Sequence, residues 1–396
     1  EVPGLGEPNA AESNSLAVIN LEDPAQPRLM TFLPTGLPFG GRSAGGSSPS
    51  GVAATADRVF VTNAHNDSVT IINAGTLRVE NEIALRIPGL ESLRGVLPIG
   101  VSFHEASGRL LVAEAGINAI GVLDVSEGKV LGHIPACWFP TRVITRGATV
   151  YTSNAKGFGT GPNADLKKSF QGEMRRGTIT VFAMPKQEEL ARLTKAVYSN
   201  NGFNPASQPA QNLPEQLRNV VIIVKENRTF DEVFGDISGT PELARYGAAV
   251  TPNHHHAAER WAISDNFYAD SEVSVDGHHW IVGSYPNAWT ESSLMASYGG
   301  QKDFRLPTTA PGRLIFPESS SSVHPEEQLE AGAIWHHLER HGISFRNFGE
   351  GFELAGVNEG EGLKPTGARY FTNVPMPGPL FRNTSRDYPQ YNMNIP

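Results

Sequence analysis

The chain has 396 residues, of which 39% are hydrophobic and 18% charged, and this length allows two or three domains with a substantial core. Its formal net charge of −9 removes the general electrostatic case for a nucleic-acid partner, while its 41 glycines and 29 prolines predict a turn-rich β component. Cys137 is the only cysteine, which excludes an intramolecular disulfide, and the longest apolar run, residues 220–224, is far shorter than the roughly 20 residues of a transmembrane segment.

The first half contains three similar strand–turn–strand segments, each beginning at a proline. They cover residues 49–63, 98–113 and 140–154, and a third strand is expected after each, at residues 68–73, 119–124 and 177–182. Residues 15–20 look like the same element of an earlier unit. Units of roughly 40 to 58 residues built from short β-branched strands predict propeller blades, which bury their faces only by stacking around a centre.

Two of these strands end in Val-Thr-Asn63 and Thr-Ser-Asn154, and these ends resemble the YVTN-type propeller repeats over about residues 10–195. Three to four blades are visible by this pattern, fewer than a closed ring usually has. We therefore expect either that an N-terminal portion lies outside this chain or that other segments complete the ring. The blade histidines His65, His104 and His133 are expected to be surface or loop-packing residues rather than ligands.

After the blades, residues 186–196 look like a short amphipathic helix, and residues 199–216, rich in Asn, Pro, Gln and Ser, indicate a linker. Residues 219–224 then form a continuous apolar run, which predicts a parallel strand buried on both faces of an α/β sheet. The predicted organisation is an incomplete β-propeller over residues 1–198, a linker over 199–216 and an α/β domain over 217–396.

The predicted strand runs directly into Glu226-Asn227-Arg228-Thr-Phe-Asp, at the edge where open α/β sheets bind ligands. This run resembles the Glu-Asn-Arg-Ser-Phe-Asp motif of bacterial phosphoesterases related to phospholipase C and acid phosphatase, within the alkaline phosphatase superfamily. The resemblance implies that Glu226 is a metal ligand, that Asn227 is a metal ligand or phosphate contact, and that Arg228 helps to bind the substrate. The alternative is a polar turn that caps a helix, with Phe230 and Phe234 packing in the core.

A second stretch, residues 263–280, looks like the family's second motif, in which a predicted strand ends in a hydroxyl residue that opens a helix. By that resemblance Ser274 is the nucleophile and a metal ligand, although Ser271 lies close enough to leave the assignment open. Free amides and the helix dipole would stabilise an ionised oxygen and an incoming phosphate there. His278 follows four residues later on the same helix face, within reach of a phosphate or leaving-group oxygen. The alternative is a serine that only caps the helix.

Two further segments are rich in histidine. Residues 251–261 predict a helix beginning after Thr251, and three adjacent histidines on it cannot all face one ion because successive helix positions point about 100° apart. Residues 324–341 predict a helix stopped by Gly342, and residues 343–348 another strand. The helix residues expected to face inward are Leu329, Ile334 and Leu338, those expected in solvent are His336, His337 and His341, and those that line a pocket after the strand are Arg346, Asn347 and Glu350.

The whole layout resembles bacterial proteins that join a YVTN-type propeller to a phosphoesterase domain. The expected fold is therefore a partial β-propeller followed by the N-terminal part of an alkaline-phosphatase-like α/β sandwich. Family members complete their metal site with Asp-Asp and Asp-His motifs far downstream, and neither pair occurs in this chain. We therefore expect a partial chain, inactive by itself, whose fold is completed by a second polypeptide.

The resemblance implies metal-dependent hydrolysis of a phosphoester through a serine nucleophile, with Ca²⁺, Mg²⁺, Mn²⁺ or Zn²⁺ as cofactor and a phosphoester as substrate. It also implies a periplasmic or extracellular location, because family members are commonly exported. The alternative is a non-catalytic exported propeller that serves as a scaffold or binding protein, with a degenerate phosphoesterase domain.

Overall fold

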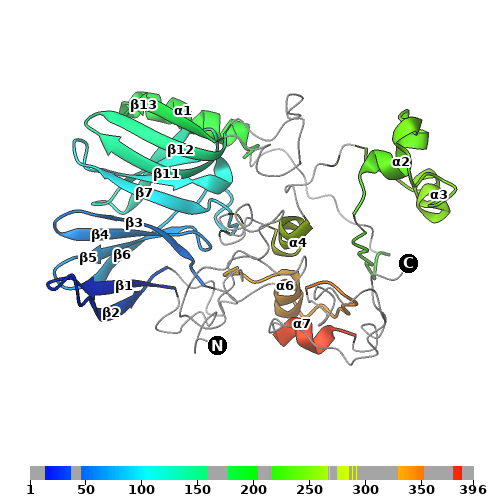
Figure 1. Cartoon of the computed structure of the whole chain (residues 1–396), viewed down its shortest axis with the longest axis horizontal. Coiled ribbons are helices and arrows are strands. Elements are labelled where there is room, and N and C mark those ends of the chain that lie inside the picture. Colours follow the sequence, from blue (N-terminus) through cyan, green and yellow to red (C-terminus); the bar gives the residue numbers. More distant parts are fainter. Residues whose placement is uncertain are drawn as a thin grey trace. The chain divides into compact units, whose positions relative to one another are not determined.

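The computed structural model of the protein describes residues 14–36, 46–157, 177–203, 214, 216–225, 227–265, 267, 274–284, 288, 291, 329–351 and 378–385. The chain divides into two compact units: residues 1–206 with 278–396, and residues 207–277 (Figure 1). No helix in the described residues is long and apolar enough to cross a membrane.

The first unit is dominated by antiparallel sheets whose strands pair in chain order. The strands are β1 (Ser15–Asn20), β2 (Arg28–Pro34), β3 (Pro49–Ala54), β4 (Arg58–Asn63), β5 (Ser68–Asn73), β6 (Arg78–Ala84), β7 (Pro98–His104), β8 (Arg109–Glu114), β9 (Ala119–Asp124), β10 (Lys129–Pro135), β11 (Trp138–Arg146), β12 (Thr149–Gly157) and β13 (Thr178–Ala183). We call β3–β6 blade 1, β7–β10 blade 2 and β11–β13 blade 3.

The three blades stack through their first strands, because β7 contacts both β3 and β11 (Figure 1). Apolar residues of blades 1 and 2 form one buried cluster, and those of blades 2 and 3 form a second. Gly51 and Gly100 permit this close approach: a Cβ atom at Gly51 would lie 2.3 Å from the Ile99 carbonyl oxygen, and one at Gly100 would lie 2.6 Å from that of Thr141. The chain thus has a partial propeller-type fold, as the repeats predicted.

Helix α1 (Gln187–Asn200) packs along β10, the last strand of blade 2. Thr194 joins the two elements, since its hydroxyl accepts a hydrogen bond of 2.8 Å from the backbone N–H of His133. Leu190 and Val197 of α1 are buried in the two inter-blade clusters. The helix is longer than the sequence predicted, and it covers an edge strand that would otherwise expose unpaired backbone groups.

Each blade carries a polar network at one position, where a residue of the second strand pairs with the first residue of the third strand. These equivalent residues are Asn63, Glu114 and Asn154. In blade 1, Asn63 donates to the Thr70 hydroxyl at 2.9 Å, and Thr70 donates to Glu82 on β6 at 2.5 Å. In blade 3, Asn154 likewise donates to the Thr180 hydroxyl, at 3.0 Å.

In blade 2 the acidic residue of the network lies on the second strand, whereas in blade 1 it lies on the fourth. Glu114 takes the asparagine position, Gly121 the threonine position and His133 the position of the blade 1 glutamate. Glu114 bonds His133 directly at 2.7 Å, and both side chains are buried. Burial opposes a charge on the His133 ring, but the adjacent Glu114 carboxylate outweighs it and holds the pKa of His133 above its ordinary value.

The second unit contains α2 (Phe230–Ser238), a short 3-10 turn, η3 (Pro241–Leu243), and α3 (Pro252–Arg260). Thr229 begins α2 with a reciprocal capping arrangement with Glu232, and Gly239 ends it in the left-handed conformation. The rings of Phe230 and Phe234 contact each other, but both side chains are half-buried and not in a core as the sequence suggested. Thr251 begins α3, but its hydroxyl donates to the Tyr246 carbonyl at 2.6 Å instead of capping the helix.

Three strand predictions in the second half are wrong for the residues that the structure describes. Residues 219–224 form no strand, and Val220 and Val221 are each 82% exposed, because no neighbouring strand there accepts their hydrogen bonds. The described residues of 262–267 also form no strand. Residues 343–348 contribute only a single bridge, from Asn347 to Thr384.

The remaining helices are α4 (Ser274–Gly283), α6 (Ile334–Arg340) and α7 (Gly378–Asn383). Helix α6 ends before Gly342 as expected but begins ten residues later than predicted, with residues 324–328 outside the described part. Of the residues expected to face inward, Leu329 is buried and Leu338 half-buried, whereas Ile334 is exposed and its neighbour Trp335 is buried instead. Buried Val282, Ala333, Trp335 and Leu380 form a small core among these helices. The predicted domain limits remain a prediction.

Blade 2 should be sensitive to a single methyl group. A Cβ atom at Gly121 would lie 2.4 Å from the Glu114 carboxylate oxygen Oε1. We expect Gly121→Ala to displace the Glu114–His133 pair and to lower the free energy of unfolding by about 1 to 3 kcal/mol, measured by urea denaturation. Gly75→Ala is the matched control, because its Cβ would meet only the Asn73 side chain at 3.5 Å. Equal stability of the two variants would contradict this account.

Candidate functional site

The predicted nucleophile lies at the beginning of a helix. Ser274 is the first residue of α4, and His278 follows four residues later, one turn along the same helix face. The sequence expectation that a hydroxyl residue opens a helix here is therefore met in the backbone. The side chain of Ser274 lies outside the described part of the structure, as does Ser271.

His278 is oriented by a carboxylate from a distant part of the chain. Its Nδ1 lies 2.8 Å from Glu350 Oε1. Glu350 is itself held by Asn347, whose Oδ1 accepts from the Glu350 backbone N–H at 3.2 Å and whose Nδ2 donates to the Glu350 carbonyl at 2.7 Å. The sequence placed Asn347 and Glu350 near the site, and the structure brings Glu350 to His278.

The first motif lies in the second unit. Glu226 is outside the described residues, and Asn227 is exposed. Arg228 donates to the Asn227 carbonyl at 3.0 Å, and its guanidinium lies 5.0 Å from the centre of the Tyr246 ring. Among the described residues, which include neither Glu226 nor the side chain of Ser274, no three His, Cys, Asp or Glu side chains are grouped closely enough to hold a metal ion. The assignment of Glu226, Asn227 and Ser274 as metal ligands remains a prediction.

The three adjacent histidines of α3 have separate environments. His256 is exposed and lies against Trp261, and His254 is half-buried. His255 is buried, with Nε2 2.8 Å from Asp236 Oδ1 and Nδ1 2.9 Å from the Thr251 carbonyl oxygen. Both contacts favour the protonated ring, with that to Asp236 the stronger, and they raise the pKa of His255 above its ordinary value. His255 therefore joins α2 to α3.

The histidines of α6 also differ from one another. His337 and His341 are exposed, as expected, and their rings lie together. His336 is half-buried, and its Nδ1 accepts a hydrogen bond of 3.1 Å from the Ala333 backbone N–H at the start of the helix. Burial lowers the pKa of His336 to about 4, which matches a neutral ring acting as an acceptor.

The blade histidines have structural roles. His104 joins blade 2 to blade 3, with Nε2 2.8 Å from the Gly147 carbonyl oxygen, and His133 pairs with Glu114. His65 lies in the β4–β5 turn, and its Nε2 accepts a hydrogen bond of 3.0 Å from the Ala288 backbone N–H. The sequence did not predict this last contact, which joins blade 1 to Ala288 after α4.

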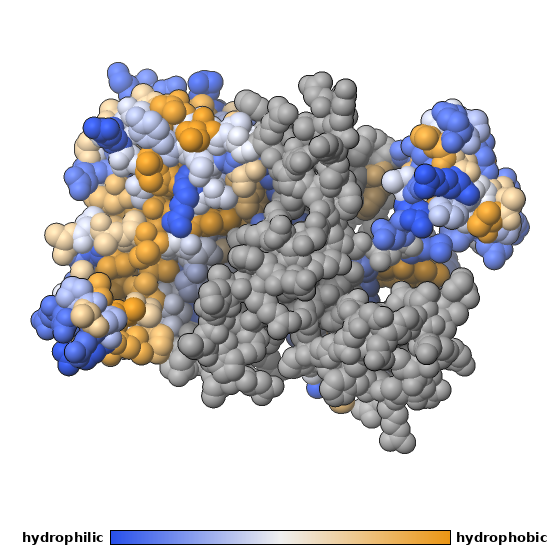
Figure 2. All heavy atoms as spheres, viewed as in Figure 1, coloured by the Kyte–Doolittle hydropathy of each residue, from blue (hydrophilic) through white to orange (hydrophobic). Residues whose placement is uncertain are grey.

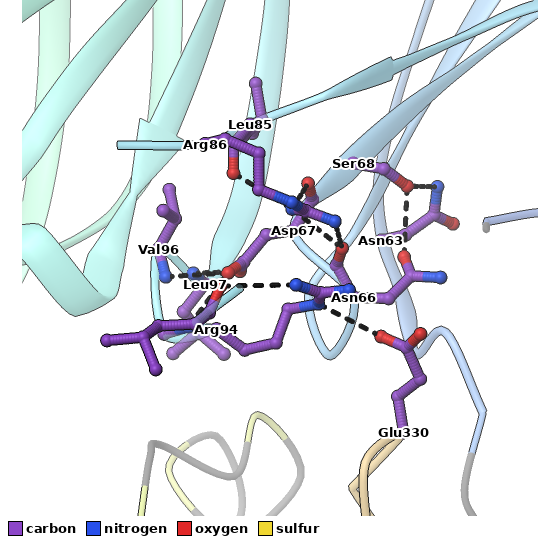
Figure 3. Close-up of polar contacts among 12 residues, drawn as sticks. Asn63, Asn66, Asp67, Ser68, Leu85, Arg86, Arg94, Val96, Leu97 and Glu330 are labelled. Carbon is purple, nitrogen blue, oxygen red and sulfur yellow. Dashed lines mark hydrogen bonds and ion pairs between the residues drawn. The ribbon is translucent and has the colours of Figure 1, made fainter. Parts of the chain in front are cut away.

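A buried carboxylate organises the same end of the blades (Figure 3). Asp67 accepts hydrogen bonds from the backbone N–H groups of Gly95, Val96 and Leu97 at 2.8, 3.1 and 2.9 Å. Burial raises the pKa of Asp67, and these three donors oppose the rise. Arg86 donates to the carbonyl oxygens of Asp67 and Leu85 beside it. The crossover from blade 1 to blade 2 is thereby fixed.

Arg94, in this crossover, reaches a residue from the C-terminal half. Its Nε lies 3.4 Å from Glu330 Oε2, and the Glu330 side chain is buried (Figure 3). Burial raises the pKa of Glu330 to about 7, although the Arg94 charge acts in the opposite direction. The Glu330 carboxyl group thus titrates near neutral pH. Through Arg94 it joins the residues just before α6 to the blades.

A second ion pair lies at this end of the blades. Lys156 Nζ, on β12, is 3.0 Å from Glu291 Oε2, with the two side chains 15% and 2% exposed. The Lys156 ammonium also lies 5.0 Å from the centre of the Phe139 ring. Ala288 packs in a buried cluster with residues from the ends of the inner strands, namely Ala64, Leu97, Ala115 and Phe139. The segment after α4 is therefore anchored on the propeller, a contact between distant residues for which the sequence carries no local signal.

Comparison with solved structures finds similarities of low score. The chain is similar to hydrazine synthase from Kuenenia stuttgartiensis, with 21% identity, 28% of this chain and 30% of that chain covered, and a TM-score of 0.24. It is similar to a catalytically inactive variant of virginiamycin B lyase from Staphylococcus aureus with quinupristin, with 18% identity, 36% and 42% covered, and a TM-score of 0.27. A streptogramin B lyase gives 14% identity, 44% and 50% covered, and a TM-score of 0.27.

The chain therefore spans half or less of the length of each of these three proteins. No family model matches the chain, and a search of curated proteins finds no match. The propeller-type fold rests on the strand order and blade stacking described above, and the chemistry of the site rests on its residues.

The Lys156–Glu291 pair should be required to hold Glu291, which follows α4 in sequence, against the propeller. Lys156→Met leaves the Glu291 carboxylate buried beside an apolar side chain, and we expect it to destabilise the first unit by about 3 to 5 kcal/mol in chemical denaturation. The double variant Lys156→Met/Glu291→Leu also removes the unpaired buried carboxylate, and we expect it to recover most of the lost stability. A single variant as stable as the unchanged protein would show that the pair does not hold the segment.

The second unit should lose stability at high pH. Because the pKa of His255 is higher in the folded protein than its ordinary value of 6.5, its contribution is complete below pH 6.5 and is lost as the pH rises through the folded pKa. The protection factors of residues 230–260 in hydrogen exchange, taken relative to the intrinsic exchange rate at each pH, should fall correspondingly above pH 6.5. His255→Gln should remove this pH dependence and the exposed neighbour variant His256→Gln should retain it; the opposite pattern would contradict the assignment.

Proposed function

We propose that the protein is a metal-dependent phosphoester hydrolase in which Ser274 is the nucleophile. The observation that carries the proposal is the placement of Ser274 as the first residue of α4 with His278, oriented by Glu350, one turn later. A serine hydroxyl at a helix N-terminus lies beside unpaired backbone N–H groups that favour negative charge. The resemblance of Glu226-Asn227-Arg228 to the phosphoesterase motif supplies the reaction class.

The proposed reaction has two displacement steps. The Ser274 Oγ attacks phosphorus and gives its proton to solvent, the bond from phosphorus to the leaving oxygen breaks, and a phosphoserine forms. His278 gives a proton to the leaving oxygen, while Glu350 holds the ring in place. Water then attacks phosphorus and gives a proton to the neutral His278 ring, the bond from phosphorus to Oγ breaks, and the Ser274 Oγ takes a proton from solvent.

The proposed metal ligands are oxygen donors: the Glu226 carboxylate, the Asn227 amide and the Ser274 hydroxyl. This donor set suits a hard divalent cation such as Mg²⁺, Ca²⁺ or Mn²⁺, and Zn²⁺ if histidine contributes. A divalent ion bound there would lower the pKa of the serine hydroxyl and offset the charge of the phosphoryl group. Asn227 and Arg228 would contact the phosphate oxygens, since neither repels an anion.

The wider fold is part of the same proposal. Residues 217–396 would be the N-terminal part of an alkaline-phosphatase-like α/β sandwich, completed by another polypeptide, and the protein would act in the periplasm or outside the cell. The exposure of Val220, Val221 and Ile223 is consistent with a segment that becomes a buried strand only when neighbouring strands are present. The alternative, a non-catalytic propeller scaffold, is the outcome if the test below fails.

The test is hydrolysis of p-nitrophenyl phosphate and of its bis ester by the protein assembled with the polypeptide that completes its sandwich, with each of the four metal ions. We expect Ser274→Ala to reduce kcat by at least about 1,000-fold and Glu350→Gln to reduce it by about 10- to 100-fold. Glu226→Gln should weaken metal binding, measured by titration calorimetry without substrate. Ser271→Ala is the matched control. Loss of activity in that variant instead of Ser274→Ala would overturn the nucleophile, and no turnover with any metal would favour the scaffold.

A further inference from the structure

Blade 3 has an exposed apolar face at positions that are buried in the preceding blade. In blade 2, Ile120 and Val122 are 0% and 1% exposed because blade 3 covers them. The strand registers place Ile179 and Val181 of β13 at the same two positions in blade 3. These residues are 74% and 56% exposed, and Ile144 of β11, directly across the sheet, is 61% exposed. This face has the residue types of an interface between blades, but no further blade covers it in the part of the chain that the structure describes.

Whatever packs on the blade 3 face must differ from an ordinary blade, because blade 3 lacks the glycine that Gly51 and Gly100 provide in blades 1 and 2. Gly51 and Gly100 let the first strand of the following blade approach to backbone contact. The equivalent residue of blade 3 is Arg142, which is exposed. Its long charged side chain excludes a first strand at that distance. The partner must therefore present an apolar sheet face without an innermost strand opposite Arg142.

The β1–β2 sheet of this chain has that form. The sequence of β1, Ser-Leu-Ala-Val-Ile-Asn, follows that of β5, Ser-Val-Thr-Ile-Ile-Asn, and both pairings carry a register shift before the second isoleucine position, at Val18/Ile19 and Ile71/Ile72. β1 and β2 thus correspond to the third and fourth strands of a blade, and the described residues pair no inner strand with them.

One face of the β1–β2 sheet is apolar and exposed. Cross-strand partners Ile19 and Leu29 are 53% and 55% exposed. The turn between the strands carries exposed Glu22 and Asp23, while exposed Arg146 lies at the end of β11 beside the blade 3 face. Figure 2 shows hydrophobic residues on the visible surface near both ends of the stack of sheets that Figure 1 labels. The two faces therefore match in apolar character, and the acidic turn is opposite in charge to Arg146, while Arg28 of β2 is also exposed beside Leu29.

We propose that a second copy of this chain covers the blade 3 face with its β1–β2 sheet, and that the reciprocal contact closes a head-to-tail dimer. Ile144, Ile179 and Val181 of one protomer pack against Ile19 and Leu29 of its partner. Arg142 occupies the space that an innermost strand would take. The dimer contact involves neither Ser274 nor a metal ion, so it is independent of the proposed hydrolase activity.

The dimer is tested by sedimentation equilibrium of the full chain. We expect a mass twice the chain mass of 42.7 kDa at micromolar concentration. Ile179→Asp and Ile19→Asp place a charge in the two faces, and each alone should raise the dissociation constant on the order of 100-fold. Val250→Asp, at a residue 63% exposed in the second unit, is the control and should leave the mass unchanged.

Mixing the two disrupted variants distinguishes a head-to-tail contact from a symmetric one. The Ile19→Asp chain retains its blade 3 face and the Ile179→Asp chain retains its β1–β2 face, so a mixture can form one intact contact and should again dimerise. A single-chain mass for the unchanged protein, an open series of larger oligomers, or a mixture that stays monomeric would each overturn the proposal. Circular dichroism of both variants confirms that the substitutions leave the sheets folded.

Discussion

The stacking of sheets through their apolar faces is the constraint on which this structure depends. A four-stranded antiparallel sheet with two apolar faces cannot stand alone in water, so each blade requires a neighbour on both sides. Gly51 and Gly100 set the distance at which neighbours meet, because backbone carbonyl oxygens occupy the space where their side chains would be. The cores between blades, the position of α1 over β10 and the surface left exposed on blade 3 all follow from this packing.

The same end of the blades brings distant parts of the chain together. Buried Asp67 fixes the crossover between blades 1 and 2 by accepting three backbone N–H groups, and Arg94 of that crossover holds Glu330. Lys156 holds Glu291 at the end of blade 3. The propeller thereby holds two residues that precede α6 (Ile334–Arg340) in sequence, and α6 in turn lies shortly before Glu350, the partner of His278. Rigid sheets commonly position functional groups carried on less regular segments in this way.

The blades were predictable because their information is local: each strand, turn and strand lies within a few tens of residues, and the Asn63 and Asn154 positions repeat. Contacts between distant residues were not. Residues 219–224 have the composition of a buried strand, but a strand needs partners, and none is present among the described residues. In the candidate site, the start of α4 at Ser274 and the place of Glu350 near it were expected. The Arg94–Glu330 and Lys156–Glu291 pairs join residues whose neighbours in sequence give no sign of each other.

The exchange of the acid between strands in blade 2 has a consequence for the ancestry of the repeats. If all blades descend from one unit with Asn and Thr at the two positions, as in blades 1 and 3, the changes leading to Glu114, Gly121 and His133 have a preferred order. A carboxylate at position 114 meets any side chain at position 121, whereas a glycine there is tolerated beside the ancestral asparagine at the cost of one hydrogen bond. On that premise the glycine would have preceded Glu114 and His133, through a blade whose network had one hydrogen bond fewer.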